Sequence, residues 1–196
     1  MAETHAPRNE GIRFGRTVIS VAVGELVDQP VEAIVAGGNR RAMFAAGPSG
    51  TLWNAAGEEV ERELRTHAPF EIGAAIATGS GRLADRGIAH ILHVIIAAGL
   101  GERPKQLEIP HALREAMEIA SRLRVRSIAF PLLGAASDAP LEDRVEAARV
   151  VLEIFLAHLR TRSHRIERGI LVSRFEDDRA PLQELLVRAR ERLWTE

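Results

Sequence analysis

The chain has 196 residues, of which 46% are hydrophobic and 27% are charged, and its formal net charge at pH 7 is −1. This composition is typical of a soluble globular protein, and the net charge gives no basic field that would make nucleic acid an expected partner. Because the sequence contains no cysteine, it excludes disulfide bonds, thiolate metal sites and cysteine nucleophiles.

Residues 1–11 are polar, and we predict a flexible tail there, followed by a single domain over residues 12–196. No stretch approaches the roughly 18 uninterrupted apolar residues of a membrane-spanning helix, so we expect a cytoplasmic protein with no membrane partner. Apolar and β-branched runs predict strands over residues 17–23, 31–36, 74–78, 88–98, 126–131 and 169–175. Apolar residues at helical spacing predict helices over residues 49–64, 110–123, 141–159 and 181–194.

Strands that alternate with helices in this way indicate an α/β fold. We predict a three-layer α/β/α sandwich with a mixed, largely parallel central sheet.

Two loops rich in small residues follow predicted strands and carry the main functional signal. The first runs from Gly37-Gly38-Asn39 to Gly47-Pro48-Ser49-Gly50, and the second is Leu133-Gly134-Ala135-Ala136-Ser137-Asp138. Small side chains let several backbone N–H groups point at one anion. The carboxyl ends of parallel strands meet at one edge of a sheet, where ligands of open α/β folds bind. The two loops therefore predict a shared site for a diphosphate.

Five segments, taken in order, resemble the macrodomain family. They are the turn Gly24-Glu25-Leu26, the segment Glu32-Ala33-Ile34-Val35-Ala36-Gly37-Gly38-Asn39, the segment Gly50-Thr51-Leu52-Trp53-Asn54-Ala55-Ala56-Gly57, the pair Thr78-Gly79-Ser80-Gly81 and His90-Ile91-Leu92-His93-Val94, and Arg126-Ser127-Ile128-Ala129-Phe130-Pro131-Leu132-Leu133-Gly134. The resemblance spans residues 18–193.

The resemblance implies that the partner is ADP-ribose or an ADP-ribosylated protein, bound without a metal or an organic cofactor. Many family members also remove ADP-ribose from proteins or deacetylate O-acetyl-ADP-ribose. By resemblance, Glu25, with Leu26 beside it, accepts from the adenine amino group, Asn39 faces the distal ribose, and Phe175 stacks on adenine. Adenine ligands should then outcompete their hypoxanthine counterparts. The resemblance assigns the diphosphate to Gly47, Pro48, Ser49 and Gly50 in the first loop and to Gly134, Ala135, Ala136, Ser137 and Asp138 in the second. Leu133 is also expected to contact the ligand.

The sequence also departs from the family pattern. Alanines replace usual glycines at positions 45, 46 and 136, and an alanine forced into a left-handed conformation costs roughly 1–2 kcal/mol. The loops must therefore differ in shape or carry strain. Ser49 stands where many hydrolases of the family have an aspartate. Asp138 matches the acid of a subclass that pairs it with a lysine, but the matching position is near Ala97, and the only lysine, Lys105, lies elsewhere in the sequence.

Simpler interpretations stand beside these roles. Asn39 after a strand is a common turn residue, and Asp138 before Ala139-Pro140 suits the N-cap of the next helix. Three functions therefore remain open. They are a module that binds ADP-ribose, a hydrolase of ADP-ribosyl esters that uses Asp138 or a water held by Asn39, and a scaffold that has lost the ligand.

Overall fold

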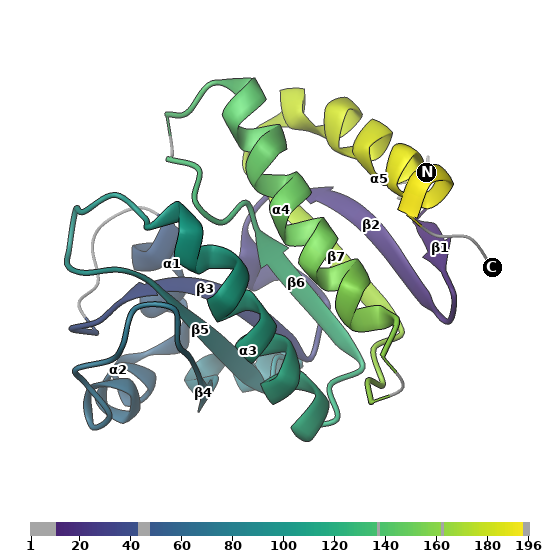
Figure 1. Ribbon diagram of the computed structural model, residues 1–196. Helices are drawn as coiled ribbons and strands as arrows, with labels where there is room; N and C mark the ends of the chain where they lie inside the picture. The colour runs from purple at the N-terminus through teal and green to yellow at the C-terminus, as the bar shows by residue number, and fades with distance from the viewer. Residues whose placement is uncertain (1–10, 43–47, 137, 162, 194–196) are drawn as a thin grey trace, which may run out of the picture.

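A computed structural model describes residues 11–42, 48–136, 138–161 and 163–193. Seven strands form one sheet in the order β1-β2-β7-β6-β3-β5-β4 (Figure 1). Their bounds are β1 Ile12–Phe14, β2 Thr17–Val23, β3 Ala33–Asn39, β4 Ala75–Gly79, β5 His90–Ala97, β6 Ser127–Pro131 and β7 Arg168–Ser173. The edge strands β1 and β4 pair antiparallel with their neighbours, and every other pairing is parallel. The sheet is therefore mixed and largely parallel, as predicted.

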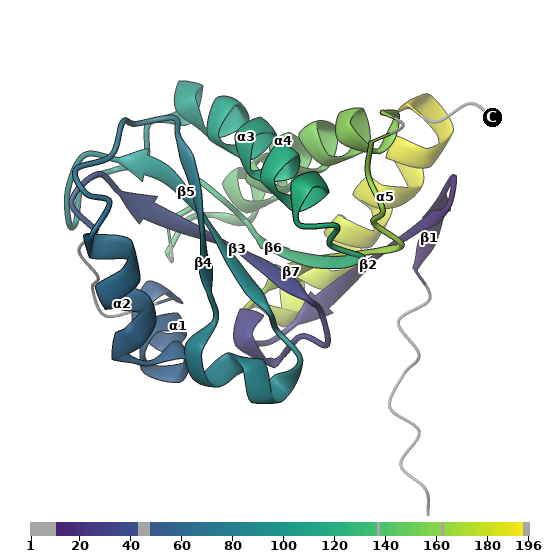
Figure 2. The same ribbon diagram turned by 90° about the horizontal axis from the view of Figure 1, so that it is seen from below.

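Helices cover both faces of this sheet, which makes the fold a three-layer α/β/α sandwich (Figure 2). The helices are α1 Pro48–Ala56, α2 Glu58–Arg65, α3 Ile109–Arg122, α4 Leu141–Leu159 and α5 Arg179–Leu193. Short 3-10 helices lie at Leu26–Asp28, Gly81–Arg86, Gln106–Glu108 and Glu176–Asp178. No helix in the described part of the chain is long and apolar enough to cross a membrane.

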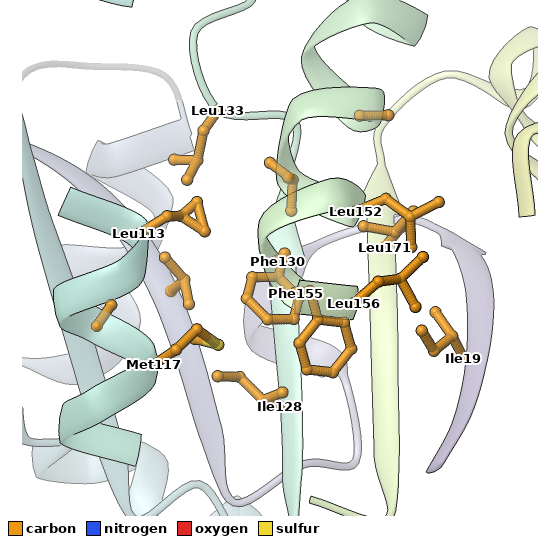
Figure 3. Packing of buried hydrophobic residues seen from close by; sticks show 14 of the residues in the cluster. Ile19, Leu113, Met117, Ile128, Phe130, Leu133, Leu152, Phe155, Leu156 and Leu171 are labelled. Atoms are coloured by element: carbon orange, nitrogen blue, oxygen red, sulfur yellow. The ribbon is translucent and has the colours of Figure 1, made fainter. Parts of the chain in front are cut away.

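The core divides into two clusters because successive side chains of a strand point to opposite faces. In β3, Ala33 and Val35 join the cluster beneath α3, α4 and α5, whereas Ile34 and Ala36 join the cluster against α1 and α2. Figure 3 shows the first cluster, where side chains of α3 and α4 pack over β6 and β7. The rings of Phe130 and Phe155 meet there with centroids 4.8 Å apart.

Most predicted elements are confirmed, but the short strand β1 was not predicted and some bounds need correction. The single helix predicted over residues 49–64 is two helices, α1 and α2, because Gly57 has φ +95° and breaks the helical path. The last strand ends at Ser173, so Phe175 lies beyond it and precedes a 3-10 turn. The predicted tail lies outside the described residues except for Gly11, and β1 begins immediately after it.

Candidate functional site

A cleft of about 550 Å³ opens at the carboxyl ends of the parallel strands. Its size is in the range of small-molecule binding sites. The wall is formed by residues 24–27 after β2, 36–39 of β3, 51–52 of α1, 131–136 at and beyond the end of β6 and 172–175 at and beyond the end of β7, together with Arg144 and parts of 96–104. Parallel pairing brings these strand ends to one edge of the sheet, so segments far apart in sequence converge there.

The structure brings most of the predicted site residues to this wall. Those that line it are Glu25, Leu26, Asn39, Leu133, Gly134, Ala135, Ala136 and Phe175. Gly47 and Ser137 lie outside the described residues. Pro48, Ser49 and Gly50 form the start of α1, and the wall takes Thr51 and Leu52 from that helix rather than Gly50.

Asn39 is the last residue of β3 and shapes the turn that follows. Its side-chain Oδ1 accepts a hydrogen bond from the Arg41 N–H at 3.1 Å, and its carbonyl accepts from the Ala42 N–H at 3.0 Å. The side chain is buried and also lines the cleft. Asn39 therefore stabilises the turn that follows β3, and it also lines the cleft. Gly37 and Gly38, predicted as loop, still belong to the strand.

The second loop keeps its shape through Gly134. This residue has φ +93°, and an added Cβ would lie 2.5 Å from Cδ1 of Ile109 and 2.9 Å from Oε1 of Gln106. Gln106 Nε2 also donates to the Gly134 carbonyl at 3.0 Å. The left-handed non-glycine residues in the described chain are Ala42 and Arg124, so Ala136 does not carry the strain of a left-handed conformation. Ala45 and Ala46 lie outside the described residues.

Backbone donors remain available in the second loop. Within the described residues, the N–H groups of Gly134 and Ala136 have no hydrogen-bond acceptor, whereas those of Leu133 and Ala135 are paired with Pro131 and Leu132. Unpaired N–H groups on a cleft wall are what an anion requires.

One end of the cleft carries an ion pair that the sequence did not predict. Nη2 of Arg174 donates to Oε2 of Glu25 at 2.6 Å and to Oγ1 of Thr51 at 3.1 Å. Glu25 and Arg174 follow β2 and β7, which are neighbours in the sheet. The carboxylate to which the resemblance gives adenine recognition therefore already has a cationic partner.

A second arginine covers the aromatic ring predicted to stack on adenine. The Arg144 guanidinium carbon lies 4.3 Å from the centroid of the Phe175 ring. The nitrogens of the same guanidinium bind the buried carboxylate of Asp178. Hydrogen bonding to Asp178 raises the pKa of Arg144, so the guanidinium stays charged. At this position of the cleft, the Arg144 guanidinium therefore lies over one face of the Phe175 ring.

The carboxylate that the resemblance indicates for catalysis, Asp138, does not line the cleft. Asp138 is exposed and is not part of the cleft wall, and Pro140, not Asp138, is the N-cap of α4. Glu102, which the sequence did not single out, does line the cleft. The Lys105 N–H donates to the Ile96 carbonyl at 2.7 Å, so the only lysine lies near the end of β5 although its side chain is exposed.

The residues missed by the sequence are Thr51, Glu102, Arg144 and Arg174. Arg174 could have been predicted at the site from the sequence, because it is next to Phe175, which the resemblance places there. Arg144 occupies an ordinary polar position of α4, and only the sheet order brings it to Phe175 and Asp178. Within the described residues, no three histidine, aspartate or glutamate side chains gather as metal ligands would.

This chain matches a family model and the sequences of several known proteins. The macro domain family model matches residues 35–148. A macro domain-containing protein of Caldanaerobacter subterraneus is 29% identical over 160 residues, which are 79% of this chain and 89% of the relative. The ADP-ribose glycohydrolase MACROD1 of Rattus norvegicus is 28% identical over 170 residues, which are 86% of this chain and 64% of the relative.

Solved structures agree in fold. The Oceanobacillus iheyensis macrodomain aligns with a TM-score of 0.74 at 20% identity, covering 92% of this chain and 96% of that one. The Trypanosoma brucei macrodomain in complex with ADP-ribose aligns with a TM-score of 0.70 at 22% identity, covering 85% and 68% of the two chains.

Proposed function

Because the chain belongs to the macrodomain family, we propose that its cleft binds ADP-ribose, either free or attached to a protein. The observation that supports this most is that Gly37-Gly38-Asn39, where the first small-residue loop was predicted to begin, and residues 133–136 of the second loop line one cleft. The unpaired N–H groups of Gly134 and Ala136 suit a diphosphate, and Asn39 suits the distal ribose.

Calorimetric titration with ADP-ribose tests this proposal directly. We expect saturable binding of one ligand per chain. At an ADP-ribose concentration 100 times the dissociation constant, the free energy of unfolding should rise by about 2.7 kcal/mol. A chain that neither releases heat nor gains stability with ADP-ribose is a scaffold that has lost the ligand, and the proposal then fails.

Ala136→Glu is expected to weaken ADP-ribose binding by about tenfold or more. Ala136 is an exposed residue on the cleft wall, so the new carboxylate adds a like charge beside the diphosphate without disturbing the core. The measurement is the dissociation constant by calorimetry. Ala136→Gln is the matched control because it has nearly the same size without the charge. Equal weakening by both variants would indicate a steric effect, and unchanged binding by Ala136→Glu would place the diphosphate elsewhere.

Hydrolysis of ADP-ribosyl esters is a second candidate, favoured by the 28% identity to a protein named as an ADP-ribose glycohydrolase. Two carboxylates are available to activate water. Asp138 is indicated by the resemblance, and Glu102 is the one that lies on the cleft wall. Ser49 alone cannot serve as a general base at neutral pH.

We expect slow single-turnover hydrolysis of O-acetyl-ADP-ribose that depends on one of these two carboxylates. A general base contributes about 100-fold or more, so the variant that lacks it, Asp138→Asn or Glu102→Gln, should lose that factor. The other variant should keep the rate of the parent. Turnover that survives both substitutions would contradict a carboxylate base and redirect attention to Asn39.

A further inference from the structure

We propose that Arg174 is a second base-recognition residue beside Glu25, and that the pair lets the cleft hold a 6-oxopurine such as hypoxanthine as well as adenine. This inference rests on the proposed function, because it concerns the base of a nucleoside diphosphate ribose bound in the cleft. It replaces the expectation, drawn from Glu25 alone, that hypoxanthine ligands are rejected.

The pair is built into the cleft wall. Glu25 and Arg174 follow neighbouring parallel strands, and the register pairs Val23 with Ser173 immediately before them. The Glu25 carbonyl accepts from Gln29 Nε2 at 2.8 Å and from the Asp28 N–H at 3.2 Å, which holds the turn while leaving the carboxylate to Arg174.

Hydrogen-bonding capacity remains on both side chains. Every contact recorded for the Arg174 guanidinium uses Nη2, and the Glu25 carboxylate is engaged through Oε2. Within the described residues, Nη1 and Nε of Arg174 and Oε1 of Glu25 have no partner. The side chains are 34% and 39% exposed, so a ligand can reach them. The cleft therefore presents charged donors and a charged acceptor side by side.

A purine base presents two adjacent groups on its pairing edge. Adenine offers an amino donor at position 6 and an acceptor at N1, whereas a 6-oxopurine offers an acceptor at O6 and a donor at N1. A lone carboxylate accepts a hydrogen bond from the amino group of adenine. The O6 of hypoxanthine is also a negative acceptor, so the same carboxylate would repel it. With Arg174 present, the guanidinium can donate to N1 of adenine or to O6 of hypoxanthine, while Glu25 accepts from the remaining donor.

The neighbouring aromatic residue makes this end of the cleft suited to a base. Phe175 adjoins Arg174 in the chain and also lines the cleft, with the Arg144 guanidinium over its ring. Planar guanidinium and phenyl groups stack on any purine, so stacking does not distinguish the two bases. Discrimination at this site is therefore left to the Glu25–Arg174 pair.

Competition between ADP-ribose and inosine diphosphate ribose tests the inference in the full chain. We expect the parent to bind both ligands with dissociation constants within about tenfold of each other. Arg174→Met should raise the ratio of the inosine to the adenosine dissociation constant by about tenfold or more, which is the strength of one charge-assisted hydrogen bond. Glu25→Met should move this ratio in the opposite direction, because the guanidinium then faces the adenine amino group.

Arg86→Met is the matched control. Arg86 forms an ion pair with Asp28 in the same turn that carries Glu25, at 2.8 Å, but it does not line the cleft. Its removal should leave the ratio unchanged. A parent that binds ADP-ribose but rejects the inosine ligand by more than about 100-fold, or a ratio that Arg174→Met does not change, overturns the inference and leaves the proposed function intact. Failure of the parent to bind either ligand overturns both.

Discussion

Replacing Arg144 with methionine is expected to lower the free energy of unfolding by about 3–5 kcal/mol. The side chain of Asp178 is completely buried and that of Arg144 is 13% exposed. Nε of Arg144 lies 3.0 Å from both carboxylate oxygens and Nη2 lies 2.6 Å from Oδ1, while Ser173 Oγ donates to Oδ2. Removing the guanidinium leaves a buried carboxylate without its counter-charge, and an unpaired buried charge strongly lowers the free energy of unfolding.

Urea-induced unfolding of the parent and the variant measures this difference. Arg149→Met is the matched control, because Arg149 lies on the same helix and its ion pairs with Glu146 and Glu153 are on the surface. Its loss should change stability by less than about 1 kcal/mol. The double variant Arg144→Met with Asp178→Asn should recover part of the loss, since no charge is then left buried. Equal effects of Arg144→Met and Arg149→Met would contradict the assigned importance of the buried pair.

Acidification is expected to destabilise the protein through His93. This ring is 1% exposed, stacks on Trp53 with centroids 5.5 Å apart, and lies 2.8 Å from Oγ1 of Thr78 through Nε2. Burial lowers the pKa of His93 from 6.5 to about 3, so the folded protein keeps the ring neutral. Between these two values the unfolded chain binds the proton and the folded chain does not.

The sign of the pH dependence follows from this difference in proton binding. Stability is insensitive to His93 above pH 6.5 and falls as the pH decreases, reaching a loss of about 2 kcal/mol at pH 5. Burial also lowers the pKa of His158 to about 4, so His158 makes acid destabilise the protein in the same way.

His93→Gln isolates the contribution of His93, because glutamine cannot titrate and still offers a donor to Thr78. The free energy of unfolding, measured in urea at pH 7 and pH 5, should fall with acidification by about 2 kcal/mol less in this variant than in the parent. His90→Gln, on the same strand but not buried, should follow the parent. The same acid sensitivity in His93→Gln and the parent would contradict the assignment.

The sequence by itself determined most of the helices and strands and the edge of the sheet at which the cleft lies. The helix over residues 141–159 has the predicted bounds, and the strand over residues 17–23 does as well. These predictions hold because helix and strand periodicity is a local property of the apolar pattern. Residues 37–39 and 133–136 line one cleft because parallel strands place their carboxyl ends together, whichever strands are neighbours.

Only the tertiary structure decided which charged side chains face the cleft. Glu25 and Arg174 are 149 residues apart and Arg144 and Asp178 are 34 apart, and each pair exists because of the sheet order and the packing of α4. The same holds for Glu102, which reaches the wall, and for Asp138, which does not. A linear pattern specifies which residues can be charged and exposed, but contacts between distant positions depend on strand order and helix placement, which local periodicity does not encode.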